Sequence, residues 1–235
     1  MISIGNDIVD LTAIDKHRTQ QKAFYSKILS DKEQQLYSRS SQLPFEIYVW
    51  LLWSAKESVY KFAKRLNPEL VFSPARIEIQ QLSEPEFSEF KNFQNLVLEG
   101  IKIDIYSESQ EFLNSENSGS NNISEFKYQI TYLSNTYYLR SLISDGFIAT
   151  VASGSEDFPK IRWGIKHIEQ SDYNTQSQTV RNLTIERLEQ IYPNNKISIN
   201  KSAVGYPLIL SDCVELNIPL SFAHHGHYIS YAFAY

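Results

Sequence analysis

The stretch EIYVWLLWSAKESVYKFA, residues 46–63, is apolar on almost every side, yet its second half carries three charged residues. The apolar run extends over residues 45–66 and stops before Asn67-Pro68, where proline disfavours helical backbone at the residue preceding it. We therefore predict a long and largely buried helix over residues 45–66. Charged groups in such a helix need partners, because an unpaired buried charge is costly.

On that helix Trp53, Glu57 and Lys61 recur every four residues and share one face. In isolation, Glu57 and Lys61 could form a solvated ion pair worth roughly a few tenths of a kcal/mol. In an apolar setting a metal ion on the carboxylate and a phosphate on the ammonium explain them better. Asp7, in the strand-like run ISIGNDIV (residues 2–9), is the candidate for a second carboxylate. Alternatively, Asp7 is only a turn former after the preceding Gly-Asn pair.

The rest of the chain mixes strands and helices without a strict βαβ alternation, which predicts the α+β class. Ser30 and Glu33 have the spacing of a capping box, so we expect a helix to begin there. Apolar spacing predicts a second helix over residues 178–191, and the Ser-, Asn- and Glu-rich segment 107–125 is expected to be an exposed loop. Alternating residues predict strands over 76–80, 126–133, 136–143 and 147–152, and two strand-rich stretches end the chain.

The composition limits the classes of function. The chain has 235 residues and a formal net charge of −5, which gives no reason to expect nucleic acid as its main partner. Its single cysteine, Cys213, excludes an internal disulfide. The N-terminus does not resemble a signal peptide, and no apolar run reaches the roughly 20 residues that span a membrane. We therefore expect a cytoplasmic protein without a membrane segment.

Three of the five histidines lie in LSFAHHGHY, residues 220–228. A zinc site is one interpretation. Neighbouring residues of a strand point to opposite faces, so His224 and His225 do not easily share one ion. No cysteine partner or helical His pair completes four ligands, which disfavours zinc. We expect His225 and His227 to be more exposed than His224, with Gly226 permitting a turn between them.

Four short blocks stand out along the chain. They are Gly5-x-Asp7-Ile8-Val9; Phe24-x-x-Lys27-Ile28-Leu29-Ser30-x-x-Glu33; Trp53-Ser54-Ala55-Lys56-Glu57-Ser58-x-x-Lys61; and Gly205-Tyr206-Pro207 followed by Ser221-Phe222-Ala223-His224. In order and spacing these blocks resemble the 4′-phosphopantetheinyl transferases, particularly the holo-acyl-carrier-protein synthase branch. The Trp-x-x-Lys-Glu block joined to Gly-x-Asp is the most specific part of this pattern. The blocks make up less than half of the chain but span it from end to end.

The resemblance implies a fold of two pseudo-symmetric α+β halves, each with a small antiparallel sheet packed on a long helix. The order of the motifs is similar to the surfactin-activating type of transferase with its two halves exchanged. Residues 1–167 would form the half with the Gly-x-Asp and Trp-x-x-Lys-Glu motifs, and residues 168–235 the half with the Gly-x-Pro and His motifs. A chain holding both halves is expected to be a monomer rather than a trimer.

The family's reaction transfers 4′-phosphopantetheine from coenzyme A to a serine of an apo acyl or peptidyl carrier protein, with Mg²⁺ as cofactor and adenosine 3′,5′-bisphosphate as the product released. The resemblance implies that Asp7 and Glu57 bind Mg²⁺, that Asp7, Glu57 and Lys61 are catalytic, and that Glu57 or a water beside it takes the serine proton. The expected coenzyme A ligands are Lys61, His224, Lys201 and Lys56. Whether the carrier serves fatty acid biosynthesis or a secondary pathway stays open.

The chain departs from the family pattern at several positions. Val9 stands where the surfactin-activating type has a further acid, which favours a metal site of two carboxylates. Tyr206 replaces a lysine and Ala223 a serine, and Lys201 is a candidate to supply the missing cation. Lys56 is equally suited to a salt bridge elsewhere. These departures leave a second hypothesis open, namely a coenzyme A-binding protein of the same fold that has lost catalysis.

Overall fold

The computed structural model describes residues 3–40, 43–80, 82, 86–89, 96–98, 101–107, 122–158 and 160–235. Two long helices dominate the described part, one of 22 residues and one of 19. The helices are α1 (Lys16–Thr19), α2 (Lys22–Tyr25), α3 (Asp31–Ser40), α4 (Phe45–Leu66) and α6 (Tyr173–Ile191), with a 3₁₀ turn at Pro74–Arg76. None of the described helices is both long and apolar enough to cross a membrane.

The strands form three sheets, in which every described pairing is antiparallel except that of β5 with β9. The first sheet has the order β1 (Gly5–Asp10), β8 (Phe147–Ser153), β7 (Asn135–Ile143), β6 (Asn122–Tyr132) and β2 (Glu78–Ile79), with β3 (Glu86–Glu89) also paired to β6. The second has the order β13 (Leu220–His225), β14 (Tyr228–Ala234), β9 (Ile161–His167), β5 (Ile101–Ser107) and β4 (Leu96–Leu98). The third consists of β10 (Ile197–Lys201), β11 (Pro207–Ser211) and β12 (Val214–Leu216).

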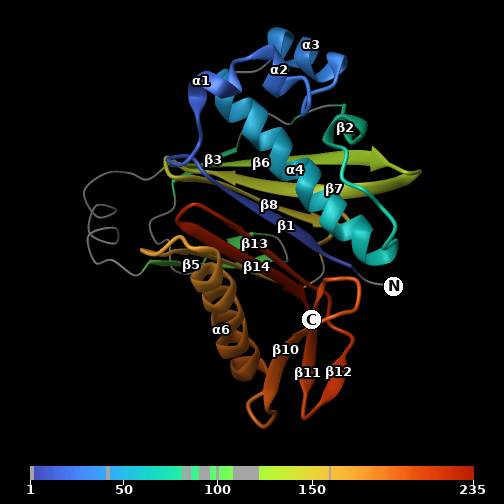
Figure 1. Ribbon diagram of the computed structural model, residues 1–235, viewed down its shortest axis with the longest axis vertical. Coiled ribbons are helices and arrows are strands. Elements are labelled where there is room, and N and C mark those ends of the chain that lie inside the picture. Colours follow the sequence, from blue (N-terminus) through green and yellow to red (C-terminus); the bar gives the residue numbers. More distant parts are fainter. Residues whose placement is uncertain are drawn as a thin grey trace.

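The two long helices cover different sheets (Figure 1). Helix α4 crosses one face of the first sheet and buries a core that includes Leu52, Ala55 and Val59 against it. A second apolar cluster lies between the first and second sheets, and a third packs α6 on the second and third sheets. The fold is therefore mixed α/β with largely antiparallel sheets and few helices, as the sequence predicted.

Strand β1 approaches α4 unusually closely at Gly5. A Cβ built on Gly5 would lie 1.9 Å from the backbone oxygen of Ser58, far closer than real Cβ contacts. Only glycine therefore allows β1 to lie against the helix in this way. Because side chains alternate along a strand, Gly5, Asp7 and Val9 face α4, and Val9 is buried in the same core as that helix.

Most of the predicted elements are present. Helix α4 has the predicted bounds, and the capping box is formed, with Ser30 N donating to Glu33 Oε2 at 2.8 Å. Helix α6 starts earlier than predicted, at Tyr173, because the Asp172 side chain caps its first turn. Of the predicted loop over 107–125, most lies outside the described residues, but residue 107 belongs to β5 and residues 122–125 belong to β6, so these were wrongly expected to be loop.

A buried ion pair links α4 to the chain segments that precede and follow it in sequence. Lys56 Nζ lies 2.5 Å from Glu33 Oε2 and donates to the carbonyl of Ile28 at 2.6 Å, and both charged side chains are fully buried. Glu33 also accepts the backbone N–H groups of Ser30 and Ile79, at 2.8 and 2.9 Å. Burial lowers the pKa of Lys56, while Glu33 opposes that shift.

Lys56→Met should lower the free energy of unfolding by about 3–5 kcal/mol, because it leaves the Glu33 carboxylate buried without its cation. Urea denaturation followed by circular dichroism measures the change. The matched control is Lys32→Met, which breaks an exposed Lys–Glu pair of 2.8 Å with Glu78 and should have little effect. Equal changes in the two variants would contradict the structural role of the buried pair.

Candidate active site

Three charged side chains meet where β1 contacts α4. Lys61 Nζ lies 3.1 Å from Asp7 Oδ1 and 3.3 Å from Glu57 Oε1, and it donates to the backbone oxygen of Asn6 at 3.0 Å. Glu57 and Lys61 are one turn apart on α4, while Asp7 faces them from β1. The structure thus brings together the three residues that the sequence singled out for catalysis.

The Asp7 carboxylate is buried, and only one of its oxygens has a hydrogen-bond partner. By hydrogen-bond geometry, Oδ2 has no partner among the described residues. The Ser54 hydroxyl lies close enough to lower the pKa of Asp7 slightly, but it donates to Thr150 Oγ1 at 3.0 Å. Burial raises the pKa of Asp7 to about 7, an effect that Lys61 opposes and Glu57 strengthens. For Lys61, burial favours a lower pKa, but Asp7 and Glu57 outweigh it and raise the pKa above the usual value.

This arrangement fits a divalent cation held by two carboxylates. The unpartnered Oδ2 of Asp7 is the observation that supports the fit, because a buried carboxylate oxygen without a donor is costly and a cation would satisfy it. The described residues contain no group of three or more His, Cys, Asp or Glu side chains placed to hold a metal. A site limited to Asp7 and Glu57 suits Mg²⁺, which commonly combines one or two carboxylates with waters and substrate phosphates.

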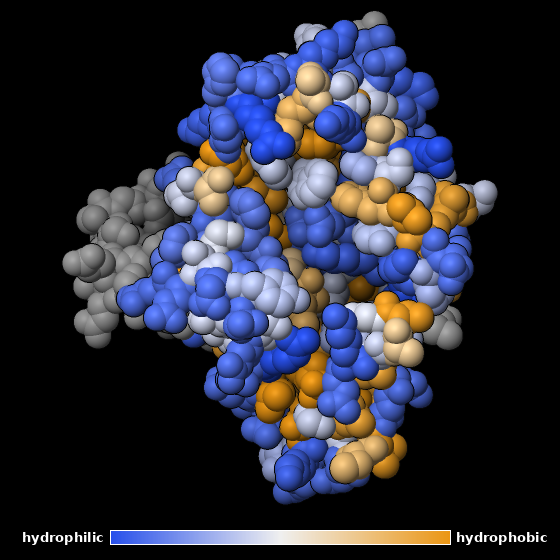
Figure 2. Space-filling view, in the orientation of Figure 1, coloured by the Kyte–Doolittle hydropathy of each residue, from blue (hydrophilic) through white to orange (hydrophobic). Residues whose placement is uncertain are grey.

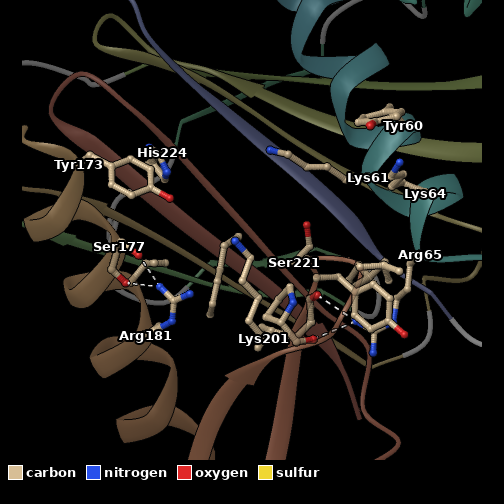
Figure 3. A pocket seen from close by; sticks show the side chains of 18 residues that line it. Tyr60, Lys61, Lys64, Arg65, Tyr173, Ser177, Arg181, Lys201, Ser221 and His224 are labelled. Atoms are coloured by element: carbon tan, nitrogen blue, oxygen red, sulfur yellow. Dashed lines mark hydrogen bonds between the residues drawn. The ribbon is translucent and has the colours of Figure 1, made fainter. Parts of the chain in front are cut away.

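A pocket of about 310 Å³ opens beside the three charged residues and shares Lys61 with them. The end of α4, the first half of α6, the turn between β10 and β11, and strand β13 form its walls (Figure 3). On the face shown in Figure 2, blue side chains border the hollow between α4 and α6, and tan and orange ones lie within it. None of its described lining residues is a carboxylate, and five are cationic, namely Lys61, Lys64, Arg65, Arg181 and Lys201.

Lys201, at the end of β10, and Arg65, on the last turn of α4, line the pocket together with Tyr206 of the turn before β11. Gly205 has a φ of +98°, a conformation that favours glycine, and a Cβ there would lie 3.7 Å from Lys201 Cε. The Arg65 guanidinium lies over the Tyr206 ring, 4.5 Å from its centre, and donates to two backbone carbonyls at 3.2 and 3.3 Å. The structure therefore supplies two cations near the position where Tyr206 replaces the family's lysine.

His224 projects into the pocket from β13, opposite Lys61 (Figure 3). It is exposed, and its ring meets the Tyr173 ring edge to face, with 5.4 Å between the ring centres. Partial burial lowers the pKa of His224, and the nearby Lys61 lowers it further. A neutral imidazole in this position retains one N–H for donation to an anion.

His225 and His227 lie away from this pocket and surround Asp10. His225 Nδ1 accepts the backbone N–H of Asp10 at 2.9 Å, and His227 N donates to the Asp10 carboxylate at 2.8 Å. Gly226 forms the turn between them with a φ of +55°. The expectation that these two histidines are the more exposed was wrong, because the His225 ring bonds β1 and the His227 ring stacks on His167 and bonds the backbone oxygen of Ile168, while His224 faces the pocket.

Lys56 is not brought into the site. Its pairing with Glu33 in the core means that the salt bridge, and not contact with coenzyme A, is the role observed for it. Sequence reasoning also missed several lining residues. Arg65 could have been found from its spacing of four after Lys61. Arg181 lay within the predicted helix, whereas Tyr173 precedes its predicted start, and only the true start of α6 places residues 173, 177 and 181 along one face.

Asp7→Asn should stabilise the protein in the absence of divalent cations, increasingly as the pH rises. A carboxyl group with a raised folded pKa binds more protons when folded, so its contribution to stability falls between about pH 4 and pH 7. The difference in unfolding free energy between Asp7→Asn and wild type should grow by about 2–4 kcal/mol from pH 4 to pH 8. Urea denaturation across this range tests it, and a pH-independent difference would refute the burial effect.

Comparison with known proteins identifies the family. The family model described as the 4′-phosphopantetheinyl transferase superfamily matches residues 3–127. No curated protein and no solved structure matches the chain. The matched segment contains Asp7, Glu57 and Lys61, whose side chains are in contact in the structure, and it covers more than half of the chain. The chain therefore belongs to the 4′-phosphopantetheinyl transferase superfamily.

Proposed function

We propose that this protein is a holo-acyl-carrier-protein synthase type of enzyme that depends on Mg²⁺. It transfers 4′-phosphopantetheine from coenzyme A to a serine of an apo acyl or peptidyl carrier protein and releases adenosine 3′,5′-bisphosphate. The observation that carries this proposal is the contact of Asp7, Glu57 and Lys61 at the mouth of a cationic pocket. A cytoplasmic location is part of the same proposal.

The charge of the pocket suits coenzyme A. The substrate carries a pyrophosphate and a further phosphate on its ribose, and phosphates bind most strongly where several lysines and arginines converge. Lys61 lies at the end nearest Asp7 and Glu57, while Lys201 and Arg65 lie further along the same pocket (Figure 3). We assign Lys61, His224 and Lys201 to phosphate binding, and the structure adds Arg65 and Arg181 as candidates.

The three contacting residues have distinct tasks in the proposed reaction. Asp7 and Glu57 would hold Mg²⁺, which when bound supplies positive charge to the pyrophosphate and its leaving group. Glu57 is partly exposed and takes the proton of the carrier serine at a carboxylate oxygen. Lys61 keeps Asp7 and Glu57 close together and offers its ammonium to the phosphate beside them.

Both proposed halves contribute to the one pocket. Lys61, Lys64 and Arg65 come from the half proposed for residues 1–167, whereas Arg181, Lys201 and His224 come from residues 168–235. A pseudo-symmetric pair of halves, each with a long helix on a sheet, accounts for the two helices α4 and α6. Because one chain lines the pocket from both sides, we propose that the active form is a monomer.

Glu57→Gln should reduce transfer at least about 100-fold while coenzyme A still binds, because the amide cannot accept the serine proton. The assay incubates the protein with coenzyme A, Mg²⁺ and several apo carrier proteins, and measures the intact mass of each carrier. Glu46→Gln, on the first turn of the same helix, is the matched control and should keep normal activity.

The same assay separates the two hypotheses. Near-normal activity of Glu57→Gln would refute its assigned role. If wild type binds coenzyme A but modifies none of the carriers, the result favours the coenzyme A-binding protein that has lost catalysis.

Size-exclusion chromatography with light scattering should give the mass of a single chain at concentrations where transfer is measured. Activity per chain should not fall on dilution, since no second chain is needed to complete the pocket. A stable trimer, or activity that disappears on dilution, would contradict the proposal that both halves of one chain form the site.

A further inference from the structure

An aromatic residue that the proposed reaction does not use lies at the rim of the pocket. Tyr173 is the first residue of α6, and its side chain is 66% exposed although it lines the same pocket as His224. Single exposed aromatic residues are common, so exposure alone indicates nothing. The position of the ring is informative, because it lies directly against the imidazole of His224 (Figure 3).

The backbone that carries Tyr173 is fixed relative to the strand that carries His224. The Asp172 carboxylate caps α6 by accepting the N–H groups of Asn174 and Thr175, at 3.1 and 3.0 Å. One turn into the helix, the buried Gln176 side chain donates to the carbonyl of Gly226 at 2.8 Å. Gly226 is only two residues beyond His224 in the β13–β14 hairpin. The start of α6 therefore stays at a set distance from His224.

Apart from the Tyr173 contact, the described residues do little to fix the orientation of the His224 ring. Within the described ranges, neither of its ring nitrogens makes a hydrogen bond, and its one ring–ring contact is the edge-to-face contact with Tyr173, at an interplanar angle of 78°. An exposed side chain without such a contact distributes over several rotamers. Edge-to-face aromatic pairs are attractive beyond the area that they bury, so this contact favours one rotamer.

We infer that Tyr173 is a positioning residue, which holds the His224 imidazole in the orientation that meets a phosphate of coenzyme A. The inference rests on the proposed function, because it takes coenzyme A as the ligand of His224. The ring of Tyr173, and not its hydroxyl, performs this task, since the contact with His224 is between the two rings. Loss of the ring should therefore weaken coenzyme A binding only when His224 is present.

A double-mutant cycle on coenzyme A binding tests this inference. Isothermal titration with coenzyme A, without a carrier protein, gives the dissociation constant of wild type, Tyr173→Phe, Tyr173→Ala, His224→Ala and the double Ala variant. Tyr173→Phe should bind within about twofold of wild type, whereas Tyr173→Ala should bind about 3- to 10-fold more weakly. In the His224→Ala background, Tyr173→Ala should cause no further loss.

Transfer kinetics provide a second readout, and Asn174→Ala is the matched control. Tyr173→Ala should raise KM for coenzyme A by a similar factor and leave kcat within about twofold, since it disturbs binding and not the group that takes the proton. Asn174 is exposed and next to Tyr173 on α6 but does not line the pocket, so its variant should behave as wild type.

Several outcomes would overturn the inference. An equal loss from Tyr173→Ala with and without His224 would mean that the tyrosine acts on the ligand directly. Loss of affinity in Tyr173→Phe would assign the effect to the hydroxyl, and unchanged affinity in Tyr173→Ala would exclude any role. If wild type does not bind coenzyme A, the proposed function fails and this inference fails with it. If wild type binds and transfers but the cycle shows no coupling, only the inference fails.

Discussion

The contact between β1 and α4 at Gly5 is the constraint on which the site depends. The strand comes so close that the backbone oxygen of Ser58 occupies the place of a side chain at Gly5. The helix matches it with small residues, since Ser54 and Ser58 both lie fully buried on the side toward Thr150 of β8. Asp7, two residues after Gly5 on β1, lies opposite the turn of α4 that carries Glu57 and Lys61. A larger residue at position 5 would separate the carboxylates that the proposed metal site needs.

The other edge of β1 joins the first sheet to the second without a regular ladder of backbone hydrogen bonds. Side chains of β13 accept two of its backbone N–H groups, Asn6 N bonding Ser221 Oγ at 3.1 Å and Asp10 N bonding His225 Nδ1 at 2.9 Å. These bonds satisfy a buried edge that pairs with none of the described strands on that side. They also set the register of β13, so that His224, which points the opposite way from its neighbour, faces the pocket. The charged residues and the cationic pocket are thus adjacent because β1 contacts both α4 and β13.

Features set by local sequence were predictable, and features set by distant partners were not. Helix α4, the capping box at Ser30 and the meeting of Asp7 with Glu57 and Lys61 followed from spacing, polarity and family resemblance. The partner of Lys56 did not, because Glu33 lies 23 residues earlier in the chain and periodicity cannot indicate which buried acid a lysine meets. His224 was predicted to be less exposed than His225 and His227, but it is the more exposed. Alternation along a strand predicts that neighbouring side chains point to opposite faces, but not which face is covered by the rest of the protein. The lining role of Arg65 was not predicted, although Arg65 lies one turn beyond Lys61 on the same face of α4, because the family motif ends at Lys61.

The burial of the Asp7 carboxylate lowers the stability of the metal-free fold. When both carboxylates are ionised, Lys61 is the one cation paired with Asp7 and Glu57 among the residues that the structure describes. These three groups then carry one excess negative charge beside an oxygen that has no donor among those residues. Two agents can remove that excess, a proton or a divalent cation. The pKa of about 7 shows that the proton already competes for Asp7 near neutral pH. Because a metal ion requires the ionised carboxylate, binding of the proposed Mg²⁺ would displace that proton, and the same unpartnered oxygen that weakens the metal-free fold would favour the cation. A third acid in place of Val9 would add negative charge to a site that one lysine already fails to neutralise, so a two-carboxylate site is the arrangement that this buried location tolerates best.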